Sequence, residues 1–254
     1  MRKDGKLRNF IDGEGWTVVR NGPLPRKRSR RCLEQTSIDP RCSPGDIGKQ
    51  LRIHSSLWLD SQCCKEFGST LATLLQSAEN VSVDKCVCLG LGSFTDGRES
   101  SKHQLATLLW MLDRLKGTYN LRQIIFQDPV FTSSDVTYLE SLGYIVLRTP
   151  HAFDAITSST FLFAPHLESN IYATALSREV PAMCVGSNVD ALLNRLDDHR
   201  SEAEEREWEN ATFKSFQEVT SSWALSVYEH DPWWYHTCLY WRKPHVTRNA
   251  CIPA

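Results

Sequence analysis

Residues 85–93 read Lys85-Cys86-Val87-Cys88-Leu89-Gly90-Leu91-Gly92-Ser93, a short apolar run that ends in glycines. A run of this length and composition is typical of a buried strand, and the glycines indicate a turn after it. The following residues 101–116 repeat leucine at helical spacing and stop before Gly117, which predicts an amphipathic helix. The chain therefore begins its ordered core as strand, turn and helix.

The same unit recurs along the chain. Further strands are expected at residues 123–127, 144–147, 160–164 and 182–186, with helices at residues 133–142 and 168–176. Strands that alternate with helices pair in parallel through right-handed crossovers. The sequence therefore predicts an α/β fold with a Rossmann-like, doubly wound and mainly parallel sheet of about five strands flanked by helices.

The two ends of the chain differ from this core. Residues 1–43 are rich in Arg, Gly, Pro and Ser and show no apolar period, so we expect a basic, disordered tail. Residues 44–254 are expected to form a single α/β domain. It contains a helical segment at residues 57–78, an acidic helix at residues 192–218 and a Trp-rich C-terminal extension. The aromatic extension either closes over the sheet edge as a lid or forms a partner site, and packing is the favoured alternative.

Charge is unevenly distributed along the chain. Residues 1–31 carry ten Lys and Arg against three Asp and Glu, a net of +7, which leaves −8 for residues 32–254 of the formal total of −1. The basic run at residues 25–31 has the composition of a nuclear import signal or a nucleic-acid-touching arm, and a solvated tail is the alternative. Because the body is acidic, nucleic acid is not an expected partner.

Nine cysteines without the spacing of a disulfide framework indicate reduced thiols, as in a cytoplasmic or nuclear protein. The chain has neither a run of eighteen apolar residues nor an apolar stretch at its start, so we expect neither secretion nor a membrane span. Cys86 and Cys88 alternate along one strand without a matching second pair, which favours buried thiols and predicts no metal site.

Polar side chains follow several of the predicted strands. The carboxyl ends of parallel strands meet at one edge of a sheet, where ligands bind. Glycines in the first turn permit close approach of a phosphate or carboxylate, and an acid after the second strand can bind a ribose hydroxyl. The candidate ligand-binding residues are Gly90, Gly92, Ser93, Asp128, His166 and Asn188.

Each of these residues also has a structural alternative. The glycines can simply turn the strand into the helix, since the chain lacks the third glycine of a dinucleotide fingerprint. Asp128-Pro129 can start a turn. A serine hydrolase triad can be written onto Ser93, Asp128 and His166, but Ser93 does not lie in a G-x-S-x-G motif. No catalytic residue is assigned, and an enzyme is not the favoured interpretation.

Four ordered blocks within residues 85–195 resemble the SRR-like domain family, named for reduced sensitivity to red light, and the chain is expected to be a fungal-type member. The matching residues are Cys88-Leu89-Gly90-Leu91-Gly92-Ser93-Phe94 with Gln104-Leu105-Ala106, Asp128-Pro129-Val130-Phe131-Thr132, Leu142-Gly143, and the segment from Phe161 to Pro165-His166. Many relatives have an acidic, glycine-containing segment where this chain has residues 148–153, so a ligand read by that loop can differ here.

The resemblance implies a regulatory or interaction protein, linked to circadian or growth regulation, with a protein partner and a location in the cytoplasm, the nucleus or both. No reaction follows from the resemblance. A small ligand at the carboxyl ends of the strands is compatible with this role. The alternative is a nucleotide- or S-adenosylmethionine-dependent enzyme or sensor that uses the turn at Gly90 and Gly92, so a nucleotide-like ligand is the expected cofactor if one is present.

Overall fold

The computed structural model describes residues 10–11, 17–18, 43–77, 81–198, 203–230 and 234–243, in two compact units. In the first unit, Met1–Gln35, β1 (Phe10–Ile11) and β2 (Thr17–Val18) pair antiparallel. The rest of the predicted basic tail up to position 42 lies outside the described residues, so its disorder stays a prediction. The second unit, Thr36–Ala254, contains the other elements.

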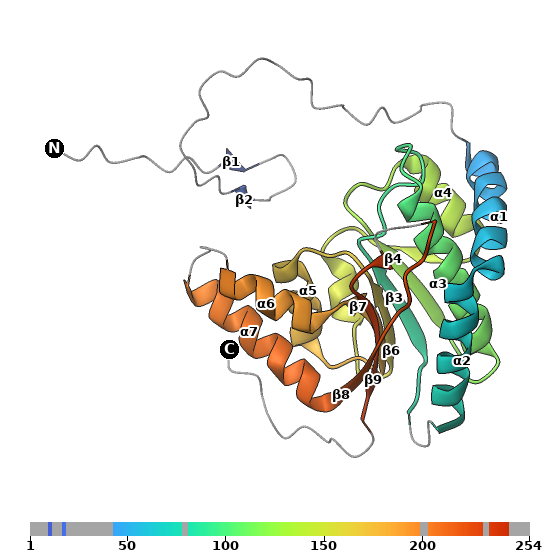
Figure 1. Cartoon of the computed structure of the whole chain (residues 1–254). Coiled ribbons are helices and arrows are strands. Elements are labelled where there is room, and N and C mark those ends of the chain that lie inside the picture. The colour runs from blue at the N-terminus through green and yellow to red at the C-terminus, as the bar shows by residue number, and fades with distance from the viewer. Residues whose placement is uncertain are drawn as a thin grey trace. The chain divides into compact units, whose positions relative to one another are not determined.

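The second unit is an α/β structure built on a seven-stranded mixed sheet in the order β5-β4-β3-β6-β7-β9-β8 (Figure 1). Its strands are β3 (Lys85–Leu89), β4 (Gln123–Gln127), β5 (Ile145–Val146), β6 (Thr160–Ala164), β7 (Met183–Ser187), β8 (Thr220–Ala224) and β9 (Thr237–Arg242). Neighbours from β5 to β7 pair in parallel, whereas β9 is antiparallel to both β7 and β8. The chain thus starts at β3, adds β4 and β5 on one side, and then adds β6 and β7 on the other.

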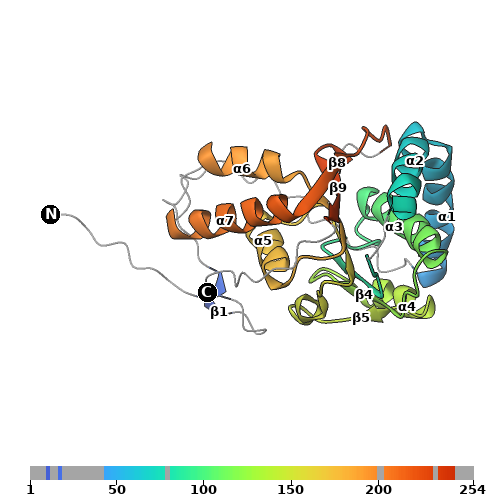
Figure 2. The ribbon, with the colours of Figure 1, turned by 90° about the horizontal axis from the view of Figure 1, so that it is seen from below.

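Helices cover both faces of this sheet. They are α1 (Pro44–Asp60), α2 (Gln62–Ser77), α3 (Ser100–Lys116), α4 (Ser133–Ser141), α5 (Ser169–Arg178), α6 (Val189–Asp198) and α7 (Ala203–Val219), with a 3-10 turn η1 (His151–Ala155). Figure 2 shows α1 to α4 on one side of the sheet and α5 to α7 on the other. Each face of the central strands is therefore shielded from water, which explains their continuous apolar runs.

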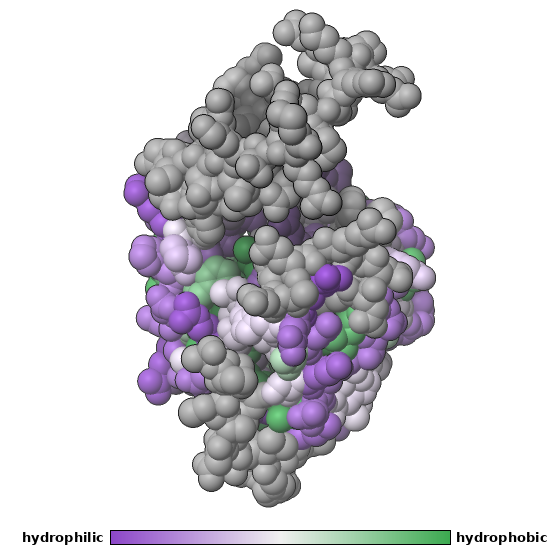
Figure 3. All heavy atoms as spheres, turned by 90° about the vertical axis from the view of Figure 1, so that its left-hand side faces the viewer, coloured by the Kyte–Doolittle hydropathy of each residue, from purple (hydrophilic) through white to green (hydrophobic). Residues whose placement is uncertain are grey.

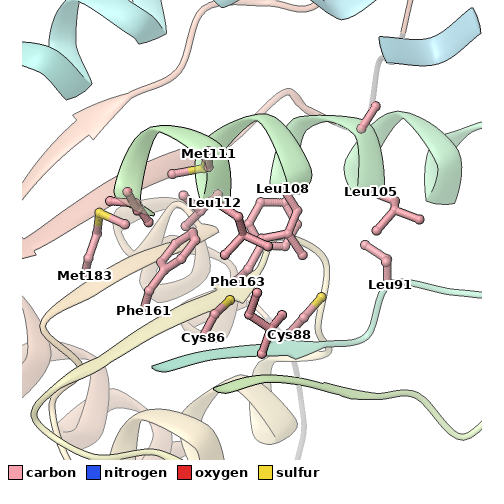
Figure 4. Packing of buried hydrophobic residues seen from close by; sticks show 14 of the residues in the cluster. Cys86, Cys88, Leu91, Leu105, Leu108, Met111, Leu112, Phe161, Phe163 and Met183 are labelled. Carbon is pink, nitrogen blue, oxygen red and sulfur yellow. The ribbon is translucent and has the colours of Figure 1, made fainter. Parts of the chain in front are cut away.

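The strand residues alternate between two hydrophobic cores. In β3, Cys86 and Cys88 belong to the core under α3, whereas Val87 and Leu89 belong to the core on the α5 side. Figure 4 shows the two thiols facing the apolar side chains of α3. Removing a leucine-sized side chain from water stabilises the fold by roughly 2 kcal/mol, so this alternation fixes the register of the strand.

The structure confirms the α/β class, and the predicted strands lie within one residue of the observed ones. The prediction of a mainly parallel sheet of about five strands is wrong, because the sheet has seven strands and is mixed. The two additional strands, β8 and β9, come from the aromatic C-terminal segment. This segment reverses direction and adds antiparallel pairs beyond β7.

The aromatic segment packs, but as part of the sheet rather than as a lid over its edge. In β9, Leu239 and Trp241 face one core, and Cys238 and Tyr240 face the other. Trp234, just before β9, is fully buried. The period-2 alternation of a strand was hidden in the sequence because both faces of β9 are apolar.

Two predicted helices are each divided in the structure. The helical pattern of residues 57–78 belongs to the end of α1 and to α2, which are separated at Ser61. The acidic segment of residues 192–218 contains most of α6 and α7. Within α7, Phe213 and Phe216 are fully buried, so one face of this acidic helix packs against the protein.

The described surface is largely hydrophilic on the side where α6 and α7 lie in Figure 1, with small separate apolar areas (Figure 3). Across residues 43–77, 81–198, 203–230 and 234–243, no helix has the length and apolar composition that a bilayer crossing requires.

Candidate functional site

The turn after β3 requires glycine at two positions. Gly90 and Gly92 have φ angles of +70° and +79°, in the left-handed region that side chains disfavour. A Cβ atom on Gly90 would lie 2.3 Å from Cδ2 of Leu167, and a Cβ atom on Gly92 would lie 2.6 Å from Oγ of Ser101. Backbone conformation and close packing therefore account for both glycines, whether or not the turn also contacts a ligand.

Asp128 follows β4 and connects its carboxyl end to the glycine turn. The backbone N–H of Gly92 donates to Oδ2 of Asp128 over 2.7 Å, and the N–H of Val130 donates to Oδ1 over 2.9 Å. Burial raises the pKa of the Asp128 carboxyl above its ordinary value, and the carboxylates of Asp135 and Asp96 act in the same direction against these two donors. The carboxylate is thus held in a defined orientation beside the turn.

Ser93 lies in a buried hydrogen-bond network. Its hydroxyl donates to Oδ2 of Asp135 over 2.7 Å, and it accepts a hydrogen bond from the N–H of Thr95 over 3.1 Å. The N–H of Phe94 donates to Oδ1 of the same Asp135 over 3.0 Å. The predicted hydroxyl donor is therefore used within the protein to connect the turn after β3 to the start of α4.

Asp135 itself was not predicted as part of this edge. It forms a capping box with Thr132, whose side chain caps α4, whereas the sequence interpretation placed the cap at Ser133 or Ser134. The sequence signal was the T-x-x-D pattern of residues 132–135, which resembles the capping box usually written with Glu or Gln. What the pattern could not indicate is that the same carboxylate also accepts hydrogen bonds from the turn after β3.

His166 and Asn188 follow the carboxyl ends of β6 and β7, so they extend the same edge of the sheet. Burial lowers the pKa of His166 to about 4, and its imidazole is neutral at neutral pH. Oδ1 of Asn188 accepts a hydrogen bond from the N–H of Ala191 over 3.1 Å, which caps α6. The structure thus brings Gly92 and Asp128 into direct contact, while Asn188 has a structural role in starting a helix.

A second polar group, absent from the sequence prediction, lies at the start of α3. Nε2 of His54 is 2.6 Å from Oε2 of Glu99, whose other oxygen accepts a hydrogen bond from Nζ of Lys102 over 2.8 Å. Next to them, the ring of His103 makes an edge contact with the ring of His54, with centroids 4.4 Å apart. Lys102 and His103 are only 5% and 4% exposed, which is unusual for such side chains.

No group of three or more His, Cys, Asp or Glu side chains is arranged to hold a metal ion in the part of the chain that the structure describes. The cysteines that the structure describes are free and buried, which confirms the prediction of buried thiols at Cys86 and Cys88.

Comparison with known proteins accounts for this combination of fold and edge. The SRR1 domain matches residues 61–240 of the chain. This chain belongs to the SRR1 family. The SRR1-like protein of Mus musculus is 32% identical over 227 residues, a match that covers 72% of this chain and 88% of the mouse protein. A crystal structure of a mutant of MtNAS is 10% identical and covers 79% of this chain and 73% of that chain, with a TM-score of 0.34 that carries no structural argument.

The SRR1 match extends beyond the four blocks that the sequence resemblance was based on. It begins at the start of α2 and continues through β8 into β9, so the two antiparallel pairs belong to the SRR1 region. All six predicted site residues lie inside it, as do Asp135 and His103. His54 lies in α1, before the matched region.

Proposed function

We propose that this SRR1-family chain is a regulatory protein that binds a small ligand with a vicinal diol, such as the ribose of a nucleoside, beside Asp128. The observation that carries the proposal is the orientation of the Asp128 carboxylate by the N–H groups of Gly92 and Val130. A carboxylate oxygen can accept two hydrogen bonds, so one acceptor position remains on each oxygen. Two neighbouring hydroxyl groups match two such positions.

The proposal includes a Rossmann-like, doubly wound interpretation of the parallel part of the sheet. Strands are added on one side of β3 and then on the other, and ligands in such sheets bind where the order reverses, outside the carboxyl ends. Gly90, Gly92 and Asp128 lie at the carboxyl ends of β3 and β4, on one side of this point. In this proposal, His166 and Asn188 border the same ligand from β6 and β7.

A binding role is favoured over hydrolysis. In a serine hydrolase, the nucleophilic hydroxyl must donate to a histidine base. Here the hydroxyl of Ser93 donates to Asp135 and the side chain is 2% exposed. The regulatory role, its link to circadian or growth control, a protein partner and a cytoplasmic or nuclear location are proposed from the family resemblance alone.

The test compares ligands that differ only in the diol. Adenosine, S-adenosylmethionine, NAD and ATP would be screened for thermal stabilisation of the full chain, together with 2′,3′-dideoxyadenosine, since a ligand that binds the folded state raises its apparent stability. We expect stabilisation by at least one diol-bearing compound and none by the dideoxy nucleoside. Loss of two hydrogen bonds to a charged acceptor weakens binding by roughly a hundredfold or more.

The protein side of the test uses Asp128→Asn, with the exposed Asp113→Asn on α3 as the matched control. Asp128→Asn should weaken the dissociation constant by at least about tenfold, because the amide keeps one acceptor oxygen, and Asp113→Asn should leave it unchanged. Equal binding of the dideoxy compound, or no stabilisation by any diol-bearing compound, would refute the proposal. Turnover of S-adenosylmethionine or a nucleotide in the same samples would instead support the alternative of an enzyme.

A further inference from the structure

Residues 225–230, which follow β8, cross from the sheet to the helices on the α3 side. Sγ of Cys63 in α2 donates to the carbonyl oxygen of Ser226, and the hydroxyl of Ser226 donates to Glu66 in the same helix. Tyr228 is 1% exposed, whereas its neighbour Val227 is 66% exposed. A single tyrosine therefore anchors a segment that is otherwise held by few apolar contacts.

Three histidines from three different elements are stacked where Tyr228 is buried. The ring centroid of His103 lies 4.4 Å from that of His54 in α1 and 6.3 Å from that of His230 in residues 225–230, with the second pair nearly parallel at 9°. The hydroxyl of Tyr228 is 3.2 Å from Nδ1 of His103. The rings of Tyr228 and His103 also meet edge to face at 5.3 Å.

The charged groups around this stack come from the same three elements. Lys102, 6% exposed at its side chain, and His54 share the carboxylate of Glu99 at 2.8 and 2.6 Å. Glu229 faces His230 at 3.4 Å from the solvent side and is 75% exposed. One inner carboxylate thus stands beside an ammonium group and the imidazoles of His54 and His103, so added positive charge in the stack has little compensation.

We propose that residues 225–230, here named the latch segment, form a proton-sensitive latch that neutral histidines of the stack hold closed and that proton uptake releases. A protonated His103 would be a buried cation next to Lys102 and two other imidazoles. Proton uptake by Nδ1 would also change it from an acceptor to a donor toward the hydroxyl of Tyr228. This inference goes beyond the proposed ligand site and does not depend on it.

The direction of the pH effect follows from His103. Burial lowers the pKa of His103 to about 4, and the positive charges of His54, His230 and Lys102 act in the same direction against Glu99. The released state, in which the ring meets water, has the ordinary value of about 6.5 and binds more protons. The closed state is therefore fully stable above about pH 6.5 and loses stability as the pH falls toward 4.

Release would uncover the first turn of α3. Lys102 and His103 belong to this turn, and Ser101 in the same turn packs against Gly92. The latch segment thus covers the helix end that adjoins the glycine turn, and protonation links its position to this edge of the sheet.

Hydrogen–deuterium exchange of the peptide that contains the latch segment tests the proposal between pH 7.5 and 5.0. After correction for the intrinsic pH dependence of exchange, the opening constant should rise by up to about tenfold per pH unit below pH 6.5 for uptake of one proton. In His103→Asn, whose amide can replace Nδ1 as a partner of Tyr228, this dependence should be lost. His151→Asn, at an exposed histidine of η1, is the matched control and should behave as the wild type.

Tyr228→Phe provides a second variant that keeps the buried ring and removes only the hydroxyl. It should raise the opening constant by roughly five- to tenfold at every pH and leave the pH dependence intact. A latch segment whose protection does not change between pH 7.5 and 5.0 would overturn the proposal. So would a pH dependence in His103→Asn equal to that of the wild type.

Discussion

At the scale of single residues, Asp135 joins two turns that are about forty positions apart in the sequence. Its fully buried carboxylate accepts hydrogen bonds from Ser93 and Phe94 after β3 and from Thr132 before α4. Replacement by alanine leaves these donors without an acceptor, and each buried unsatisfied donor costs roughly 1–3 kcal/mol. We expect Asp135→Ala to lower the free energy of unfolding by about 3 kcal/mol or more in urea titrations.

The control for this prediction is Asp113→Ala at an exposed position on α3, which should change the free energy of unfolding by less than about 0.5 kcal/mol. Thr132→Ala removes the helix cap but keeps the carboxylate, and an intermediate loss of about 1 kcal/mol is expected. If Asp135→Ala were as stable as Asp113→Ala, the network around Ser93 would not hold the turn.

At the scale of elements, α2 contains a glycine that conflicts with its own helix. Gly68 lies in the middle of Gln62–Ser77. A Cβ atom at this position would lie 3.5 Å from the ring of Trp110, an ordinary van der Waals distance. Alanine reduces the conformational freedom of the unfolded chain and favours the helix, so Gly68→Ala should raise the free energy of unfolding by about 0.5–1 kcal/mol.

Gly92→Ala is the matched opposite case, because the residue has a φ of +79° and its Cβ atom would meet Ser101. It should lower the free energy of unfolding by at least about 1 kcal/mol, measured in the same titrations. Destabilisation by Gly68→Ala would show that Trp110 cannot accept the added methyl group.

Helix boundaries are also an element-scale property, and Ser61 shows why one of them was missed. Its hydroxyl donates to the carbonyl of Trp58 at the end of α1 and accepts from the N–H of Cys64 at the start of α2. One serine thus ends one helix and begins the next. Periodicity continues nearly unchanged across such a break, so the pattern of residues 57–78 predicted one helix where there are two.

At the scale of the whole molecule, the two cores enclose the thiols. Burial raises the pKa of Cys63 and Cys184 to about 12 and that of Cys86 and Cys88 further. The thiolate is the reactive form of cysteine. A variant with serine at positions 32, 42 and 251 retains only the six described cysteines, which are all buried.

Ellman's reagent at pH 8 measures this protection. The native variant should release far less than one equivalent of thionitrobenzoate during the time in which a free thiol reacts completely, and about six equivalents in urea. Rapid reaction of the native protein would mean that the cores open readily. A stable slow fraction would support the packing described here.

The sequence alone determined the α/β class, the five strands from β3 to β7 and the placement of six polar or glycine residues at their carboxyl ends. These features depend on local periodicity, turn residues and the general rule that parallel strands share an edge. The sequence also determined the SRR1 resemblance, which the match over residues 61–240 confirms.

Only the tertiary structure decided the rest. The last strand, β9, inserts between β7 and β8, and nothing in its own residues specifies these neighbours. The contacts of His54 with Glu99 and of Tyr228 with His103 join residues 45 and 125 positions apart. The physical reason is that a local pattern records which face of an element is buried, whereas the partners on that face are selected by packing of the complete chain.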